Sequence, residues 1–161
     1  MPAVVIDENV PIVANRKHER AGPDCVRSCI VALRQSRGQV IVIDEGQRIL
    51  SKYRTHLSPR GQPGAGDAWF KWLWDNRANR KRCRCVSITP HTGSDTDFEE
   101  YPLDPDLARF DPADRVFVAI AIASGLNPPI LNVSDTDWWH VRQALERNGV
   151  IVRFLCDTLM P

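Results

Sequence analysis

The segment AVVID at residues 3–7 is a short apolar run, rich in β-branched residues, that ends directly in an aspartate. Residues 40–44, with the sequence VIVID, repeat this pattern. Runs of this kind are typical of strands in a parallel sheet that is covered on both faces. The runs PILNV at 129–133 and IVRFL at 151–155 indicate two more such strands.

Helical patterns separate these strands. We expect helices over residues 24–36, 46–57, 67–76, 111–124 and 137–148, where apolar residues recur at helical spacing and glycines commonly follow. Residues 83–106 are rich in Pro, Thr, Asp and Gly, and they predict a long loop with at most one short strand, CRCVSI. The alternation predicts an α/β fold, namely a three-layer α/β/α sandwich with a central, mainly parallel sheet of four to five strands.

The composition is that of an ordinary soluble protein. The 161 residues are 43% hydrophobic and 25% charged, which fits a single domain over residues 1–161. The formal net charge of +1 neither indicates nor excludes a nucleic-acid partner, so an RNA-binding surface would have to be local. Two basic groups are candidates for RNA contacts: Arg16, Lys17 and Arg20, and the group Arg80, Lys81 and Arg82. Solvated side chains at a helix end are an equally good interpretation of the second group.

Location and cysteine chemistry follow from what the sequence lacks. We find no signal peptide and no run of about 20 apolar residues, so we expect a cytoplasmic protein without a membrane segment. Five cysteines without a secretory context favour free thiols, and neither the CRC pair nor Cys25 and Cys29 have the spacing of a zinc site. Trp69, Trp72 and Trp74 are expected in the core or in a homodimer interface.

Acidic residues follow the predicted strands. Ligands of open parallel sheets bind beyond the carboxyl ends of the strands, where the strand order reverses. The acids expected near that edge are Asp7, Asp44, Glu45, Asp114, Asp135 and Asp137. Each has a structural alternative, because Asp44, Asp114 and Asp137 could each cap a helix. Asp7 has the weakest alternative of this kind.

Several carboxylates at one site repel one another unless a cation neutralises them. Oxygen ligands favour a hard ion, Mg²⁺ or Mn²⁺, and such ions catalyse phosphoryl transfer. Phosphodiester hydrolysis is therefore the natural hypothesis, although a phosphatase would need the same groups.

Three motifs resemble those of the PIN-domain family of nucleases. VVIDENVPI (4–12) resembles the family's first strand with Asp-x-Asn, FDPADRVFVAIAIASG (110–125) its central Asp-helix motif, and ILNVSDTDWW (130–139) its terminal strand-Asp-x-Asp-aromatic motif. The motifs occur in the family's order and the total length fits, so the resemblance covers nearly the whole chain. The resemblance implies a metal-dependent endoribonuclease that binds one or two Mg²⁺ or Mn²⁺ ions, and a toxin of a toxin–antitoxin system held inactive by an antitoxin protein.

The resemblance also assigns roles. Asp7, Asp114 and Asp135 become the catalytic metal ligands, Asp137 a supporting ligand, and Asn9 a polar residue that orients Asp7.

One position departs from the family pattern. Related proteins place a Glu in the helix after the second strand, where this chain has Lys52. Either Glu45 takes that role or the site has lost an acid. The alternative function is therefore a catalytically impaired PIN module that binds RNA or a protein partner. A receiver-like phosphoacceptor also gathers acids at strand ends, but IVRFLCD supplies no lysine for it.

Overall fold

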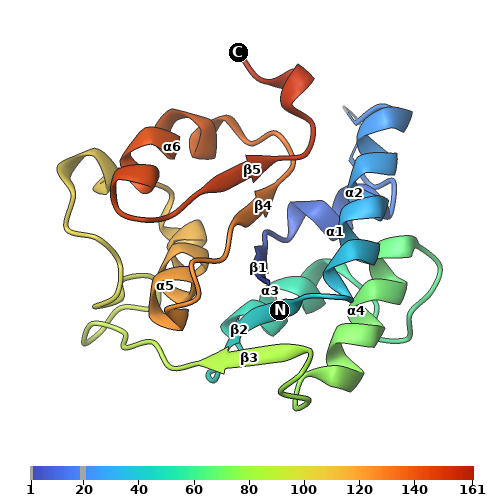
Figure 1. The fold of residues 1–161 in the computed structure, drawn as a ribbon, viewed down its shortest axis with the longest axis horizontal. Helices are drawn as coiled ribbons and strands as arrows, with labels where there is room; N and C mark the ends of the chain where they lie inside the picture. Colours follow the sequence, from blue (N-terminus) through green and yellow to red (C-terminus); the bar gives the residue numbers. More distant parts are fainter. Residues whose placement is uncertain (1, 19–20) are drawn as a thin grey trace.

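The strands form one parallel sheet. The computed structural model describes residues 2–18 and 21–161. Its strands are β1 (Ala3–Ile6), β2 (Val40–Asp44), β3 (Cys83–Val86), β4 (Ile130–Asn132) and β5 (Val152–Phe154). All neighbours pair in parallel, in the order β3-β2-β1-β4-β5 (Figure 1). The predicted fold class is confirmed.

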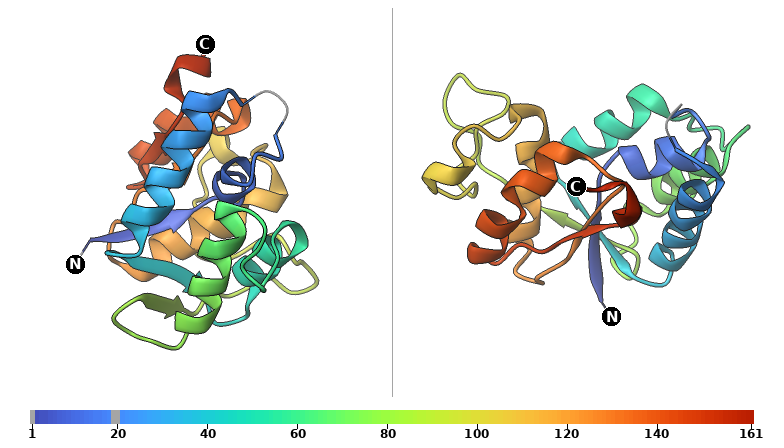
Figure 2. Two further views of the ribbon diagram at one scale, coloured as in Figure 1. Left: turned by 90° about the vertical axis from the view of Figure 1, so that its right-hand side faces the viewer. Right: turned by 90° about the horizontal axis from the view of Figure 1, so that it is seen from above.

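Helices cover both faces of this sheet. They are α1 (Asn9–Ala14), α2 (Pro23–Ser36), α3 (Arg48–His56), α4 (Ala65–Asn76), α5 (Arg115–Ser124) and α6 (Thr136–Arg147). Helices α1, α2 and α4 pack together on one side, and α5 and α6 lie on the other (Figures 1 and 2). None of the helices in the described part of the chain is both long and apolar enough to cross a membrane.

Every helix expected from the sequence is present, with ends shifted by a few residues, but α1 was not expected. It has only six residues, too few to show a helical periodicity of their own. Pro11 lies in its first turn, where the missing N–H removes no helical hydrogen bond. The sharp turn between β1 and α1 places Asp7 and Glu8 in the connection.

The strand order reverses beside β1. The chain runs from β1 outward through β2 to β3, then returns to the other side of β1 for β4 and β5. Val4 pairs with Ile41 and Val5 with Ile130, so the three central strands end at the same edge. Asp7 leaves β1 at that edge, and Asn132 ends β4 next to it. This is the position where an open α/β sheet binds its ligand.

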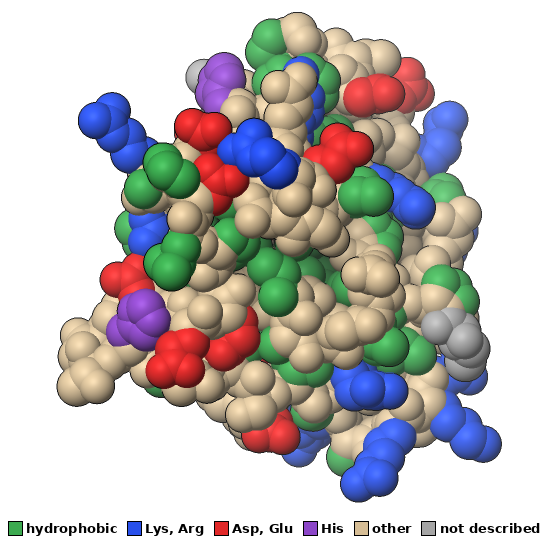
Figure 3. All heavy atoms as spheres, turned by 60° about the vertical axis from the view of Figure 1, so that its left-hand side comes forward, with side chains coloured by type: hydrophobic (Ala, Val, Ile, Leu, Met, Phe, Trp, Pro, Cys, Tyr) green, Lys and Arg blue, Asp and Glu red, His purple; other side chains and the backbone are tan. Residues whose placement is uncertain are grey.

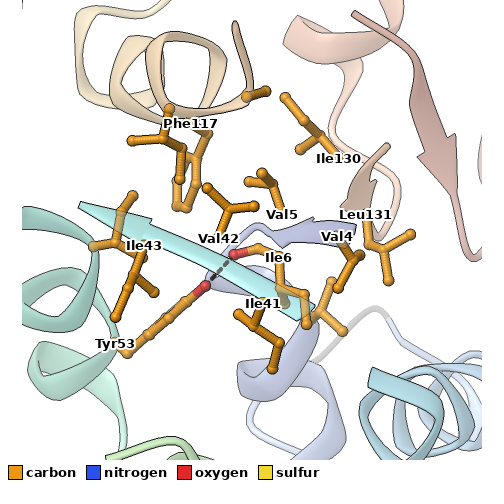
Figure 4. Close-up of a cluster of buried hydrophobic side chains, with 14 of the residues drawn as sticks. Val4, Val5, Ile6, Ile41, Val42, Ile43, Tyr53, Phe117, Ile130 and Leu131 are labelled. Atoms are coloured by element: carbon orange, nitrogen blue, oxygen red, sulfur yellow. Dashed lines mark hydrogen bonds between the residues drawn. The ribbon is translucent and has the colours of Figure 1, made fainter. Parts of the chain in front are cut away.

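A continuous apolar core supports that edge. Both faces of β1 and β2 are buried, and their side chains pack against Phe117 of α5 and Ile130 of β4 (Figure 4). Tyr53 of α3 is fully buried among them and donates its hydroxyl hydrogen to the Ile6 carbonyl oxygen, one residue before Asp7. Its ring meets Trp69 of α4 edge to face, with centroids 5.2 Å apart. Tyr53 therefore fixes α3 to the end of β1.

Tyr53→Phe is expected to lower the free energy of unfolding by about 1–2 kcal/mol, because it removes a buried hydrogen bond while keeping the ring. Urea unfolding monitored by circular dichroism measures the change. Tyr101→Phe is the matched control, since the Tyr101 hydroxyl also donates to a carbonyl oxygen, that of Leu107, but from a half-buried position. Equal stability of Tyr53→Phe and the unmodified protein would contradict this role of the hydroxyl.

One expectation about cysteines is wrong. Cys25 of α2 and Cys156, which follows β5, form a disulfide with their Cα atoms 5.4 Å apart. Cys29, Cys83 and Cys85 are free thiols. The two bonded residues are 131 positions apart, so spacing in the sequence gives no sign of the pair. Only the packing of the segment after β5 against α2 brings them together (Figure 1).

Candidate metal centre

Three carboxylates meet at the reversal of strand order. Asp7 and Glu8 come from the β1–α1 connection, and Asp114 directly precedes α5. One carboxylate oxygen of each lies within 4.8 Å of those of the other two. Asp7 is 1% exposed and Asp114 8% exposed, so neither charge is well solvated. The end of β1, the central strand, thus meets the start of α5 at this point.

Two oxygen atoms of this cluster lack a hydrogen-bond donor. They are Oδ1 of Asp7 and Oε2 of Glu8, both inaccessible to solvent. Buried polar atoms are almost always paired, because an unpaired one loses its hydration without compensation. A shared proton or a cation between the two carboxyl groups would satisfy both atoms. The donor set contains oxygen only, which fits Mg²⁺ or Mn²⁺.

The other oxygen of Asp7 is held in place. Oδ2 accepts hydrogen bonds from the Asn132 side-chain amide and from the Asn9 backbone N–H, both at 3.3 Å. Asn132 is fully buried, and its Oδ1 accepts from the Asp135 N–H at 2.9 Å. Asn132 therefore orients Asp7 and connects it to the segment after β4. Asn9 contacts Asp7 through its backbone, not through the side chain on which the expectation rested.

The electrostatics of the cluster disfavour three charged carboxylates side by side. Burial raises the pKa of Asp7 well above its usual range, and the charges of Glu8 and Asp114 raise it further. Burial, followed by the charges of Glu8, Asp111 and Asp135, raises the pKa of Asp114 to about 7. Both shifts disfavour the charged forms, and a divalent ion would reverse them.

Asp135 lies at the rim of the cluster. Its side chain caps α6 by accepting from the Asp137 N–H at 2.9 Å. Burial raises its pKa, and the negative charges of Asp137, Asp111 and Glu8 add to the effect. Asp135 is thus near enough to feel the cluster, but it is not among the three acids that could share one ion. Asp137 is exposed, and the idea that it caps α6 is wrong, because Asp135 does so.

The acids after β2 are not brought to the cluster. Asp44 is buried and accepts from the backbone N–H groups of Arg48 and Ile49, so it caps α3 as its structural interpretation predicted. Glu45 is exposed and lines a hollow beside β3 with Arg77, Arg80 and Cys85. Glu45 therefore does not replace the missing helix Glu.

Lys52 reaches the cluster from α3. Its Nζ lies 3.8 Å from Oε1 of Glu8, and both side chains are mostly buried. The same Nζ lies 5.7 Å from the centre of the Phe117 ring, and its charge lowers the pKa of Asp114. The chain thus supplies one positive charge to its own acidic site.

The two basic groups proposed to contact RNA lie at different edges of the sheet. Arg80, Lys81 and Arg82 precede β3, at the amino ends of the strands and therefore at the opposite edge from Asp7. The Arg82 guanidinium donates to the Arg37 carbonyl oxygen at 2.9 Å. Arg16 and Lys17 are exposed just after α1; Arg20 falls outside the described residues. The second basic group is thus remote from the acids of the cluster. On the face drawn in Figure 3, acidic and basic side chains are interspersed, and several Lys and Arg side chains lie toward the lower right.

Sequence reasoning missed Glu8 and Asn132. Glu8 adjoins Asp7, and consecutive residues of an extended strand would point to opposite faces. The backbone of Glu8 is instead helical, with φ −60° and ψ −24°, which turns its side chain toward the same cluster. Asn132 interrupts the apolar run of β4, and a buried polar residue at a strand end was the available signal.

Comparison with known proteins yields no relative, since neither a protein-family model, a curated protein nor a solved structure matches this chain.

Proposed function

We propose that this chain is a metal-dependent ribonuclease that hydrolyses RNA phosphodiester bonds. The observation that carries the proposal is the Asp7 carboxylate, which is only 1% exposed, has one unpartnered oxygen and lies with Glu8 and Asp114 inside 4.8 Å. A group of buried carboxylates at a strand-order reversal has no evident structural use. The motif resemblance to PIN-domain nucleases supports the same assignment.

The residues have distinct tasks in this proposal. Asp7, Glu8 and Asp114 would hold Mg²⁺ or Mn²⁺, which supplies the Lewis acidity that phosphodiester hydrolysis requires. Asn132 keeps Asp7 in orientation through its amide hydrogen bond. Asp135, whose pKa burial raises, stands at the rim where it can accept or hold a proton near the site.

A hollow lined by Asp135, at the rim of the cluster, offers room for the substrate. It has a volume of about 460 Å³ and is lined by polar groups of Asn9, Ser134, Asp135 and Thr136 together with apolar side chains that include Val133 and Leu159. Polar groups beside an apolar wall suit a nucleotide, whose phosphate and base need different surroundings. Arg16 and Lys17 are exposed just after α1, whose residues Asn9 and Val13 line the hollow, and we propose that they contact the RNA backbone.

The test is cleavage of a labelled single-stranded RNA by the purified protein with Mg²⁺, Mn²⁺ or EDTA, with DNA of the same sequence as comparison. Calorimetry under the same conditions measures metal binding. We expect saturable Mn²⁺ binding and cleavage of RNA that EDTA stops. The absence of both cleavage and binding with either metal would refute the proposal. An antitoxin protein, which the family resemblance implies, and a homodimer through the tryptophan-rich helix α4 are further partners that we propose.

A second candidate is a non-catalytic PIN-like module that binds RNA or a protein partner. The ion pair of Lys52 with Glu8 favours it, because an internal ammonium partly neutralises the acids and reduces their need for a metal. Saturable RNA binding with no saturable metal binding would support this candidate.

Lys52→Gln discriminates between the two candidates. Removing the ammonium beside Glu8 is expected to tighten Mn²⁺ binding about fivefold, since a partly screened unit charge a few ångströms away contributes about 1 kcal/mol. Calorimetric titration with Mn²⁺ gives the dissociation constant. Arg54→Gln is the matched control, because it removes a positive charge from the exposed side of the same helix, where Arg54 lies over the Trp74 ring. Equal Mn²⁺ affinity in both variants would contradict an effect of the Lys52 charge on the metal centre.

A further inference from the structure

Three sulfur atoms from distant parts of the chain meet away from the acidic site. Cys25 and Cys29 lie one turn apart on α2, and Cys156 follows β5. The sulfur of each lies within 4.8 Å of the other two. All three residues are buried, with exposures of 8%, 0% and 5% respectively. Within the described residues this is the one cluster of possible metal ligands besides the carboxylates.

The disulfide accounts for only two of these sulfurs. Cys25 and Cys156 are bonded to each other, while Cys29 is a free thiol beside them. A disulfide alone would fasten the segment after β5 to α2 and needs no third sulfur. The sulfur of Cys29 nevertheless lies within 4.8 Å of both sulfurs of the disulfide, so three sulfurs share one buried place.

The spacing fits one metal ion. A zinc–sulfur bond is about 2.3 Å, so two sulfurs on one tetrahedral zinc ion lie ~3.8 Å apart. Sulfurs that already lie within 4.8 Å need only small rotations to reach this separation once the disulfide opens. Thiolates are soft ligands that select Zn²⁺ or similar ions over Mg²⁺ and Mn²⁺. The cluster and the carboxylate centre would therefore not compete for the same metal.

A surface hollow lies near the cluster, and the cysteines themselves do not line it. This hollow of about 630 Å³ is lined by Ser28, Leu155 and Asp157, which flank Cys29 and Cys156 in the sequence. A metal ion could enter there, and a water molecule from the hollow could complete a coordination shell with three protein ligands.

We propose that, once the Cys25–Cys156 disulfide is reduced, Cys25, Cys29 and Cys156 together bind a single thiophilic metal ion of the Zn²⁺ class. A dithiol reductant supplies two electrons and two protons to the disulfide and becomes a disulfide itself, leaving Cys25 and Cys156 as thiols. Binding of the ion then releases the thiol protons to solvent, and no further electron moves. Burial raises the pKa of Cys29 to about 12, so binding strengthens as pH rises. The disulfide and the metal exclude each other.

The experiment uses the full chain carrying Cys83→Ala and Cys85→Ser, so that the cluster holds its only cysteines. The dithiol-reduced, desalted protein is titrated with Cd²⁺ alone, whose bonds to thiolates produce a charge-transfer absorption that carboxylates do not give. We expect saturation at one equivalent, displacement of Cd²⁺ by Zn²⁺, and no such absorption in the oxidised protein. Circular dichroism follows the fold throughout, and metal-induced refolding of a reduced chain would count as support.

Cys29→Ser is the decisive variant, because it retains both partners of the disulfide and removes only the third sulfur. We expect its Cd²⁺ affinity to fall by more than about 100-fold, given that even residues behind metal ligands contribute 10–100-fold. Cys29→Ala repeats the measurement with an apolar side chain if the buried hydroxyl disturbs the fold. Unchanged binding in these variants, or no thiolate absorption in the reduced triple-cysteine protein, would overturn the proposal. Neither result bears on the ribonuclease proposal, which concerns a different metal and different residues.

Discussion

Asp7→Asn is expected to reduce Mn²⁺-dependent RNA cleavage by at least about 10³-fold, equivalent to about 4 kcal/mol of transition-state stabilisation. Asp7 contributes the most buried carboxylate of the cluster, and one of its oxygens lacks a hydrogen-bond donor. An amide carries no charge, so the variant would hold a divalent ion poorly. Initial cleavage rates measured at saturating RNA and several Mn²⁺ concentrations give the change.

The same substitution should make the metal-free protein more stable. Burial disfavours the charged form of Asp7, so a neutral side chain of the same shape removes that cost. The oxygen of the introduced amide can accept from Asn132 as Oδ2 of Asp7 does, and its NH₂ group can donate to the unpaired oxygen of Glu8. We expect the free energy of unfolding in EDTA at pH 7.5 to rise by about 1–3 kcal/mol.

The combination of lost activity and gained stability separates a functional role from a structural one. Asp111→Asn is the control, because Asp111 is an exposed acid whose charge acts on Asp114 from the rim. Its activity should stay within about tenfold of the unmodified protein, since exposed charges are screened. An Asp7→Asn protein that cleaves RNA normally, or that is destabilised like a core variant, would contradict the role given to Asp7.

The fold was largely accessible from the sequence, because apolar runs and helical periodicity are local signals. The run AVVI predicted β1 at its observed bounds, Ala3–Ile6. Because Asp7 directly follows this run, the sequence also predicted its position at the carboxyl end of β1. Helix α1 was missed because six mostly apolar residues after a strand carry no periodicity of their own. Local signals thus give the elements and the edge of the sheet where strands end.

Side-chain direction was not accessible in the same way. Glu45 directly follows β2 and Glu8 is the second residue after β1, yet Glu45 turns toward β3 and Glu8 toward Asp114. The difference arises from the connection after each strand, and in β1 from the helical backbone of Glu8. The disulfide is an extreme case, since it depends on contact between segments 131 residues apart.

Lys52 illustrates how the two kinds of information combine. The sequence shows a lysine where the resemblance to PIN domains leads one to expect an acid, and on that basis alone the site has lost a ligand. The structure shows the same lysine within 3.8 Å of Glu8, an acid that the sequence argument had not used. Glu8 therefore makes up for the acid that the family pattern has at position 52. Because of the Lys52 ammonium, the net charge of the site is less negative than that of a site with a Glu at this position.

Raising the pH from about 4 to 7 is expected to lower the stability of the metal-free protein. An acid whose pKa is higher in the folded state binds more protons there than in the unfolded chain, so its contribution is complete at low pH and is lost as the pH rises through the folded pKa. Asp114 has a folded pKa of about 7, against an unfolded value of about 3.9. A shift of this size corresponds to a loss of up to about 4 kcal/mol between those two pH values, and Asp7 acts in the same direction.

Saturating Mn²⁺ is expected to abolish or invert this dependence, because the ion binds the charged carboxylates and competes with their protons. Urea unfolding at pH 4.5, 5.5, 6.5 and 7.5, in EDTA and in Mn²⁺, measures the effect. Asp114→Asn should flatten the EDTA profile, whereas the exposed Asp137→Asn should leave it unchanged. The carboxylate cluster would not be a metal centre if stability in EDTA rose steadily across this range and Mn²⁺ made no difference, because the acids would then be stabilised in their charged forms by the protein alone.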